Sequence, residues 1–330
     1  MVSSEKQGKK SGRGRGITPW HPNQHGAWPM IVIPVIVGLF WGITLWDTVP
    51  AGDRGSGLHG SGGMWLTFLT VTVAWVVGYH AFFAGGLWLT GRRSGNARVT
   101  ADARRPTLVY GAVTLVAVIV SVVLQPHLLW WAVIFVPLTV IALFEVNRGT
   151  PRSLIAGVAE TVASAFLIPV LTTVGIGSAA PVGTGITLTR SLFSTEVVTA
   201  VPTAAWVSAA WLALYQVGTV LYVKTMIRKK GDPTWLTGSI VYHAVALVIV
   251  ILTVTAEHLA LLPWIVAVIV FAWCLWRSRA VPRDAASGAS GTKWTPKKVG
   301  MVEIPVTVGV AVACSAAAWL YDGPLVLWVG

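Results

Sequence analysis

Long apolar runs dominate the pattern of hydrophobic and polar positions along this chain of 330 residues. Each run is close to the ~20 residues that a helix needs to cross the hydrocarbon core of a bilayer. The runs lie at about 27–46, 64–90, 107–124, 127–146, 154–176, 203–227, 236–255, 258–276 and 304–321. The pattern therefore predicts an all-α integral membrane protein with nine transmembrane helices.

The polar segments divide the chain into a tail and a membrane domain. Residues 1–21 are basic and rich in glycine, which is typical of a disordered tail. Residues 22–330 then form a single polytopic domain, in which 277–303 is expected to be a cytoplasmic linker between the last two helices. The composition agrees, because only 11% of the residues are charged, whereas soluble domains carry about 25%.

The basic residues indicate how the helices are oriented. With nine helices, every Lys and Arg except Arg54 and Arg190 falls on one side. Cytoplasmic loops carry the excess of Lys and Arg, so we expect the N-terminus inside and the C-terminus outside. The net charge of +12 comes from these loops rather than from one surface stripe, which argues against a nucleic-acid partner.

Two pairs of helices share short patterns. The second and sixth helices both carry Trp-x3-Tyr followed by paired basic residues, at 75–93 and 211–229. The first and fifth share Ile-Pro-Val, at 33–35 and 168–170. This similarity favours two parallel four-helix halves plus a ninth helix, an arrangement that places sites where the halves meet. Chance similarity between apolar segments is the alternative.

Polar groups inside the spans are the candidates for function, because an aspartate, lysine or arginine at the centre of a span costs ~2.5–3.5 kcal/mol. Most of them fall in the cytoplasmic half, which predicts a polar cavity open to the cytoplasm. It would be lined by the starts of helices one and five and the ends of helices two, four and six. The candidate lining residues are Gln24, His25, Asn147, Glu160, Tyr215, Gln216, Tyr222, Lys224 and Arg228.

The chemistry of this set favours an anionic amphipathic ligand, because lysine and arginine bind phosphate oxygens. Each basic residue has a simpler interpretation, as a positive-inside residue or one that extends to the interface. Glu160 could likewise pair with Lys224 or Arg152 for structure alone. A transporter with His80, Glu160 and His243 as a relay is the second hypothesis, and a membrane scaffold that docks partners through its tail and linker is the third.

No motif assigns a reaction or a cofactor. The chain has no phosphate-binding loop, no zinc-protease or haem motif, and no pair of carboxylates spaced for Mg²⁺. The two cysteines, Cys274 and Cys314, both lie in apolar helices, which indicates neither a disulfide framework nor a metal site. We therefore predict no metal and no cofactor, and leave open whether the protein is an enzyme.

Three stretches resemble the YwiC-like family of bacterial multi-pass membrane proteins, whose biochemical function is unassigned. They are PNQHGAWPM at 22–30, RRP at 104–106 and LYQVGTVLYVKTMIRKK at 214–230. This resemblance implies that the protein lies in the plasma membrane of a bacterium. The layout also resembles the UbiA prenyltransferase superfamily, which has nine helices and two ligand-binding cytoplasmic loops, and this likeness implies an isoprenoid ligand. The aspartate-rich motifs of that superfamily are missing, since 91–106 contains only Asp102 and 228–235 only Asp232.

Overall fold

The computed structural model describes residues 18–22, 28–48, 60–179, 195–288 and 290–323. Within these ranges the chain is helical without strands, and nine helices are long and apolar enough to span a membrane. The predicted fold class is thus confirmed. The elements are α1 (Trp28–Asp47), α2 (Ser61–Arg93), α3 (Ala97–Leu124), η4 (Pro126–Trp131), α4 (Ala132–Asn147), α5 (Leu154–Ala179), α6 (Glu196–Thr199), α7 (Thr203–Ile227), α8 (Pro233–Leu252), η5 (Thr253–Thr255), α9 (Leu261–Ser287) and α10 (Pro296–Trp319).

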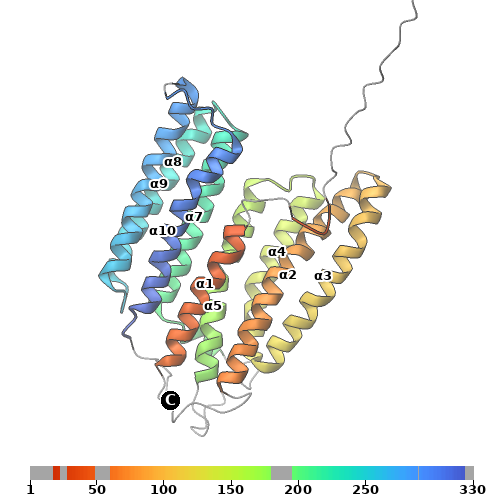
Figure 1. Ribbon diagram of the computed structural model, residues 1–330, viewed down its shortest axis with the longest axis vertical. Helices are drawn as coiled ribbons and strands as arrows, with labels where there is room; N and C mark the ends of the chain where they lie inside the picture. The colour runs from red at the N-terminus through yellow and green to blue at the C-terminus, as the bar shows by residue number, and fades with distance from the viewer. Residues whose placement is uncertain (1–17, 23–27, 49–59, 180–194, 289, 324–330) are drawn as a thin grey trace, which may run out of the picture.

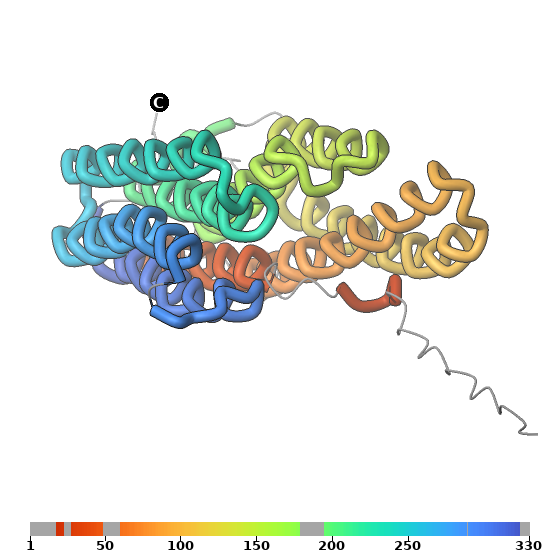
Figure 2. The backbone as a smooth tube through the Cα atoms, turned by 90° about the horizontal axis from the view of Figure 1, so that it is seen from above, coloured from red at the N-terminus to blue at the C-terminus, as the bar shows by residue number. Residues whose placement is uncertain are grey.

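The helices form two groups with a pair between them. Figure 1 shows α2, α3 and α4 on one side and α7, α8, α9 and α10 on the other, and Figure 2 shows the same division from above. The pair α1 and α5 lies between the groups, where α5 packs against α7 and α1 packs against α10. Any group on α5 or α7 that faces this junction is therefore close to both halves of the molecule.

Glycines allow α1 and α5 to cross closely. A Cβ atom at Gly175 would collide with the backbone carbonyl of Gly42, and one at Gly38 would lie 2.7 Å from a methyl group of Leu171. Small residues drive helix packing in membranes because lipid offers no hydrophobic advantage for burying large ones. The two helices that share Ile-Pro-Val are thus in direct contact, although the repeat itself stays a prediction.

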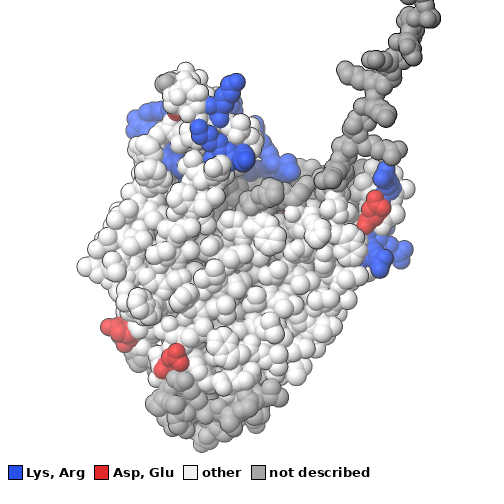
Figure 3. All heavy atoms as spheres, in the orientation of Figure 1, with Lys and Arg blue, Asp and Glu red and all other residues white. Residues whose placement is uncertain are grey.

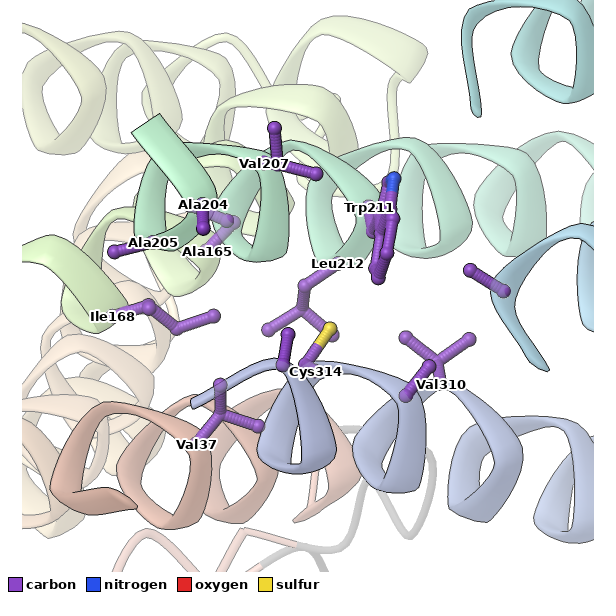
Figure 4. Packing of buried hydrophobic residues seen from close by; sticks show 14 of the residues in the cluster. Val37, Ala165, Ile168, Ala204, Ala205, Val207, Trp211, Leu212, Val310 and Cys314 are labelled. Carbon is purple, nitrogen blue, oxygen red and sulfur yellow. The ribbon is translucent and has the colours of Figure 1, made fainter. Parts of the chain in front are cut away.

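The apolar core lies along the seam between this pair and the C-terminal group. Figure 4 shows Val37 of α1, Leu212 of α7 and Cys314 of α10 converging there, with Trp211 beside them. All four side chains are buried. Away from the seam, large apolar side chains are exposed along the outer faces of the helices. An apolar exterior around a packed interior is expected where lipid is the solvent.

The basic residues gather at one end of the molecule. Among the described residues, every Lys and Arg except the buried Arg277 lies near the end of α2, α4, α7 or α9, near the start of the helix that follows, or in the turn between them. Figure 3 shows basic side chains at the upper end of the molecule, with some acidic ones beside them, and only acidic side chains among the charges visible at the lower end. This separation agrees with the predicted alternation of the loops. Which end faces the cytoplasm stays a prediction.

The linker predicted at 277–303 is shorter than expected. Helix α9 continues to Ser287 and α10 begins at Pro296, so most of this stretch is helical. In the turn between the two helices, the Asp284 carboxylate accepts hydrogen bonds from the Ser290 backbone N–H and the Trp294 indole. Two charged residues at the edges of the predicted linker, Arg277 and Glu303, consequently lie inside helices.

Candidate functional site

A chain of hydrogen bonds joins α1, α5 and α7 near the start of α1. Pro34 lies inside α1 and has no N–H, so the carbonyl of Met30 loses the helix partner that residue 34 would supply. The Ser164 hydroxyl donates to this carbonyl over 2.6 Å, and the Gln216 amide donates to the Ser164 hydroxyl over 3.1 Å. Gln216 is only 5% exposed, and its Oε1 has no partner within the described residues.

Glu160 lies one helical turn before Ser164 on the same face of α5. It is half-buried, and no hydrogen bond or ion pair of its carboxylate is found within the described part of the chain. The phenol of Tyr79 on α2 is near enough to Glu160 to interact electrostatically. The Tyr79 hydroxyl is itself buried, with no hydrogen-bond partner among the described residues. Three helices thus bring polar groups with unused hydrogen-bonding capacity to one place.

Two cations lie beside this region at the basic end of the molecule. Lys224 donates to the backbone carbonyl of Arg152 over 2.5 Å, and Arg228 donates to the same oxygen over 3.2 Å. Partial burial lowers the pKa of Arg228, and the neighbouring charge of Arg152 acts in the same direction. The Arg228 side chain remains a cation, because a guanidinium does not lose its proton in proteins. Lys224 lies ~12 Å from Gln216 along α7.

The turn between α4 and α5 borders these cations. Glu145 is buried and accepts a hydrogen bond of 2.8 Å from Thr150, which holds the turn closed. The guanidinium of Arg93 packs against Gly149, whose φ of +82° favours glycine. Asn147, a predicted lining residue, is exposed at the end of α4. It therefore lies at the basic end of the molecule rather than within the junction.

A different face of α7 forms a second polar cluster. The hydroxyls of Tyr215 and Thr219 lie 3.4 Å and 3.2 Å from Oε2 of Glu303 on α10. Oε1 of Glu303 pairs with Nη1 of Arg277 on α9. The Arg277 guanidinium also lies over the ring of Tyr222, at 4.4 Å from its centroid. Because Tyr215, Thr219 and Tyr222 are spaced at helical intervals, they share the face that meets α9 and α10.

The predicted lining residues thus fall into separate places in the structure. Glu160 and Gln216 share the junction of α2, α5 and α7, while Lys224 and Arg228 lie at its basic end. Tyr215 and Tyr222 belong to the cluster on the other face of α7. The predicted positions Gln24 and His25 lie outside the described residues.

The histidines of the predicted relay lie in separate groups. His80 on α2 interacts with the backbone carbonyl of Val76 at 2.8 Å and packs against Tyr110. His243 on α8 interacts with the carbonyl of Ser239 at 2.7 Å and is buried. Each imidazole therefore has a partner one turn earlier on its own helix. The described residues show no direct contact between His80 and His243.

Sequence reasoning missed Arg277 and Glu303, because both were assigned to the edges of a linker. One signal was available. The buried positions of α9 include Ala267, Phe271 and Cys274, and the helical spacing of this series continues through Ser278. A helix extended at this spacing places Arg277 in the interior, where it needs a counter-charge.

A family comparison matches the first part of the chain. The family described as YwiC-like protein matches residues 21–172. Residues 21–172 are YwiC-like. The predicted resemblance is thereby confirmed for this region, which runs from before α1 into α5 and contains Glu160 and Ser164. Gln216 and Lys224 lie beyond that match. Neither a curated protein nor a solved structure matches the chain.

Proposed function

We propose that this YwiC-like multi-pass membrane protein binds an anionic amphipathic ligand, a lipid or prenyl-like molecule, at the junction of α2, α5 and α7. The ligand enters from the basic end, which is the cytoplasmic side of a bacterial plasma membrane. The observation that carries the proposal is the group of unpaired polar atoms below a cationic entrance. Gln216 Oε1 and the Tyr79 hydroxyl are buried without partners among the described residues, and Lys224 and Arg228 lie above them.

The two levels of the site suit two parts of such a ligand. At the entrance, ammonium and guanidinium groups attract a phosphate or carboxylate. Deeper in the junction, the Tyr79 hydroxyl donates to an ester or ether oxygen, while Glu160 and Gln216 accept from hydroxyl groups. An apolar tail then extends between helices into lipid at little cost. A metal-dependent prenyl transfer is not part of this proposal, because the required aspartates are missing from both loops.

Native mass spectrometry of the purified protein with its lipids retained tests this function. The variant is Lys224→Ala/Arg228→Ala. The matched control is Lys229→Ala/Lys230→Ala, which removes the same charge from exposed neighbours on the same segment. We expect a defined anionic lipid or polyprenyl species on the wild type and on the control, and its loss from the first variant. Bulk phospholipid bound equally by all three proteins would overturn the proposal.

A secondary transporter is the second candidate, favoured by the ionisable groups buried in the C-terminal group. Arg277 and Glu303 are both buried inside helices long enough to span the membrane, and such residues commonly belong to ion or proton pathways. Proteoliposomes that contain a pH-sensitive dye distinguish the two functions. Proton movement that depends on an added solute would favour transport. A bound lipid without any such proton movement would favour the first proposal.

A further inference from the structure

The guanidinium of Arg277 is incompletely paired although it is fully buried. Its relative exposure is 0%, and Nη1 pairs with Glu303. Nε and Nη2 have no hydrogen-bond partner within the described residues. These two nitrogens lie on the same edge of the planar group, so their N–H bonds form a parallel fork. A fork of this kind matches the two oxygens of a carboxylate or of a phosphate.

Other hydroxyl groups on the helices of this group are also unpaired among the described residues. The hydroxyl of Tyr222 and that of Ser239 on α8 are buried without partners among the described residues. Glu303 does not serve as an acceptor for these groups, because its second oxygen already faces the hydroxyls of Tyr215 and Thr219. Several buried donors on α7, α8 and α9 therefore have no acceptor within the described part of the chain.

We infer that the Nε/Nη2 edge of Arg277 is an internal binding site for a small oxyanion that carries a carboxylate or phosphate group. The site is separate from the one proposed at the α2–α5–α7 junction, since it lies on the other face of α7. The two oxygens of the anion accept from the guanidinium fork. Nearby hydroxyls supply further donors, as in other sites that hold anions away from water.

The charge of the cluster determines what accompanies the anion. Arg277 and Glu303 cancel each other, so a monoanion alone would leave one net negative charge inside the membrane, which is costly. Binding is therefore accompanied by uptake of one proton from solution, received by the Glu303 carboxylate. The titratable groups that face Arg277 from the four helices are Tyr215, Tyr222, His243, Cys274 and Glu303.

Equilibrium binding of radiolabelled acetate and radiolabelled inorganic phosphate tests the site. The protein is placed in nanodiscs of zwitterionic phosphatidylcholine, which removes competing anionic lipid. We expect saturable binding of at least one probe, stronger at about pH 6 than at about pH 8, because one proton is taken up. Arg277→Lys keeps the charge and removes the fork, and should weaken binding about tenfold or more. The control Arg279→Lys changes an exposed residue on the same helix and should have no effect.

The variant Glu303→Gln is a second test of the same site. The amide keeps a polar group beside Tyr215 and imitates the protonated carboxyl, so the variant should bind the probe more tightly and lose the pH dependence. It decides the question even if Arg277→Lys does not fold. Lys224→Ala/Arg228→Ala should bind normally, which separates this site from the proposed lipid site. Absence of saturable binding in both the wild type and Glu303→Gln, or weaker binding in Glu303→Gln, would overturn the inference.

Discussion

The hydrogen-bond chain at the start of α1 allows a quantitative prediction about Ser164. Its hydroxyl donates to the Met30 carbonyl that Pro34 leaves without a helix partner, and it accepts from Gln216. An interhelical hydrogen bond in a membrane protein contributes about 0.6 kcal/mol on average and about 1.7 kcal/mol at most. Because Ser164→Ala removes two such bonds, we expect a loss of about 1–2 kcal/mol of unfolding free energy.

The background Pro34→Ala separates the two bonds. An alanine at position 34 has an N–H, which restores the intrahelical partner of the Met30 carbonyl. In this background Ser164→Ala loses only the bond with Gln216, so its cost should fall to about 0.6 kcal/mol. The difference between the two backgrounds is the interaction free energy of a double-mutant cycle. It should be about 0.5–1 kcal/mol in favour of the wild-type pair.

Unfolding by sodium dodecyl sulfate in mixed micelles, followed by circular dichroism, measures these free energies. Thr172→Val is the matched control, because the Thr172 hydroxyl donates only to the carbonyl of Ile168 on its own helix. That carbonyl keeps its backbone partner, so the control should cost less than about 0.5 kcal/mol. An equal cost of Ser164→Ala in both backgrounds would refute the assignment of Met30 as a carbonyl that Pro34 leaves unpaired.

Two further predictions concern packing and orientation. Gly175→Ala should lower the free energy of unfolding by about 2–3 kcal/mol, because the new Cβ atom would collide with the backbone of α1. The control Gly238→Ala, with open space around its Cβ position, should be neutral in the same unfolding assay. A cysteine at Thr255 should react with an external, membrane-impermeant thiol reagent in intact cells, and one at Ser287 should not. Labelling at Ser287 and not at Thr255 would show that the predicted orientation in the membrane is wrong.

The helix count could be predicted because each span is long, apolar and bounded by polar residues. The C-terminal end of α9 and the start of α10 could not be predicted in the same way. Arg279 and Arg283 lie on exposed or partly exposed turns of α9, and basic residues on such turns have the composition of a loop. Hydropathy predicts the end of a span where the residues stop being mainly apolar. A helix can continue beyond that point, as long as its backbone hydrogen bonds are made and one of its faces stays buried.

The lining set was predicted only in part because spacing defines a face but not its neighbour. Helical periodicity correctly placed Tyr215, Thr219 and Tyr222 together on α7. It could not show that this face meets α10, since the packing of the ninth helix depends on contacts distant in sequence. Lys224 and Arg152 were the suggested partners of Glu160, and among the described residues Lys224 donates instead to the backbone carbonyl of Arg152.

The cost of the Arg277–Glu303 pair is itself an argument about function. Replacing a buried ion pair by apolar residues of similar size is often neutral or stabilising by about 1–4 kcal/mol. Helix α10 does not need the pair for docking, since Val310, Cys314 and Ala317 pack fully against the neighbouring helices. A fold that only had to attach α10 would be at least as stable with apolar side chains at both positions. The buried charges, with one edge of the guanidinium unpaired among the described residues, are therefore better explained by a ligand than by stability.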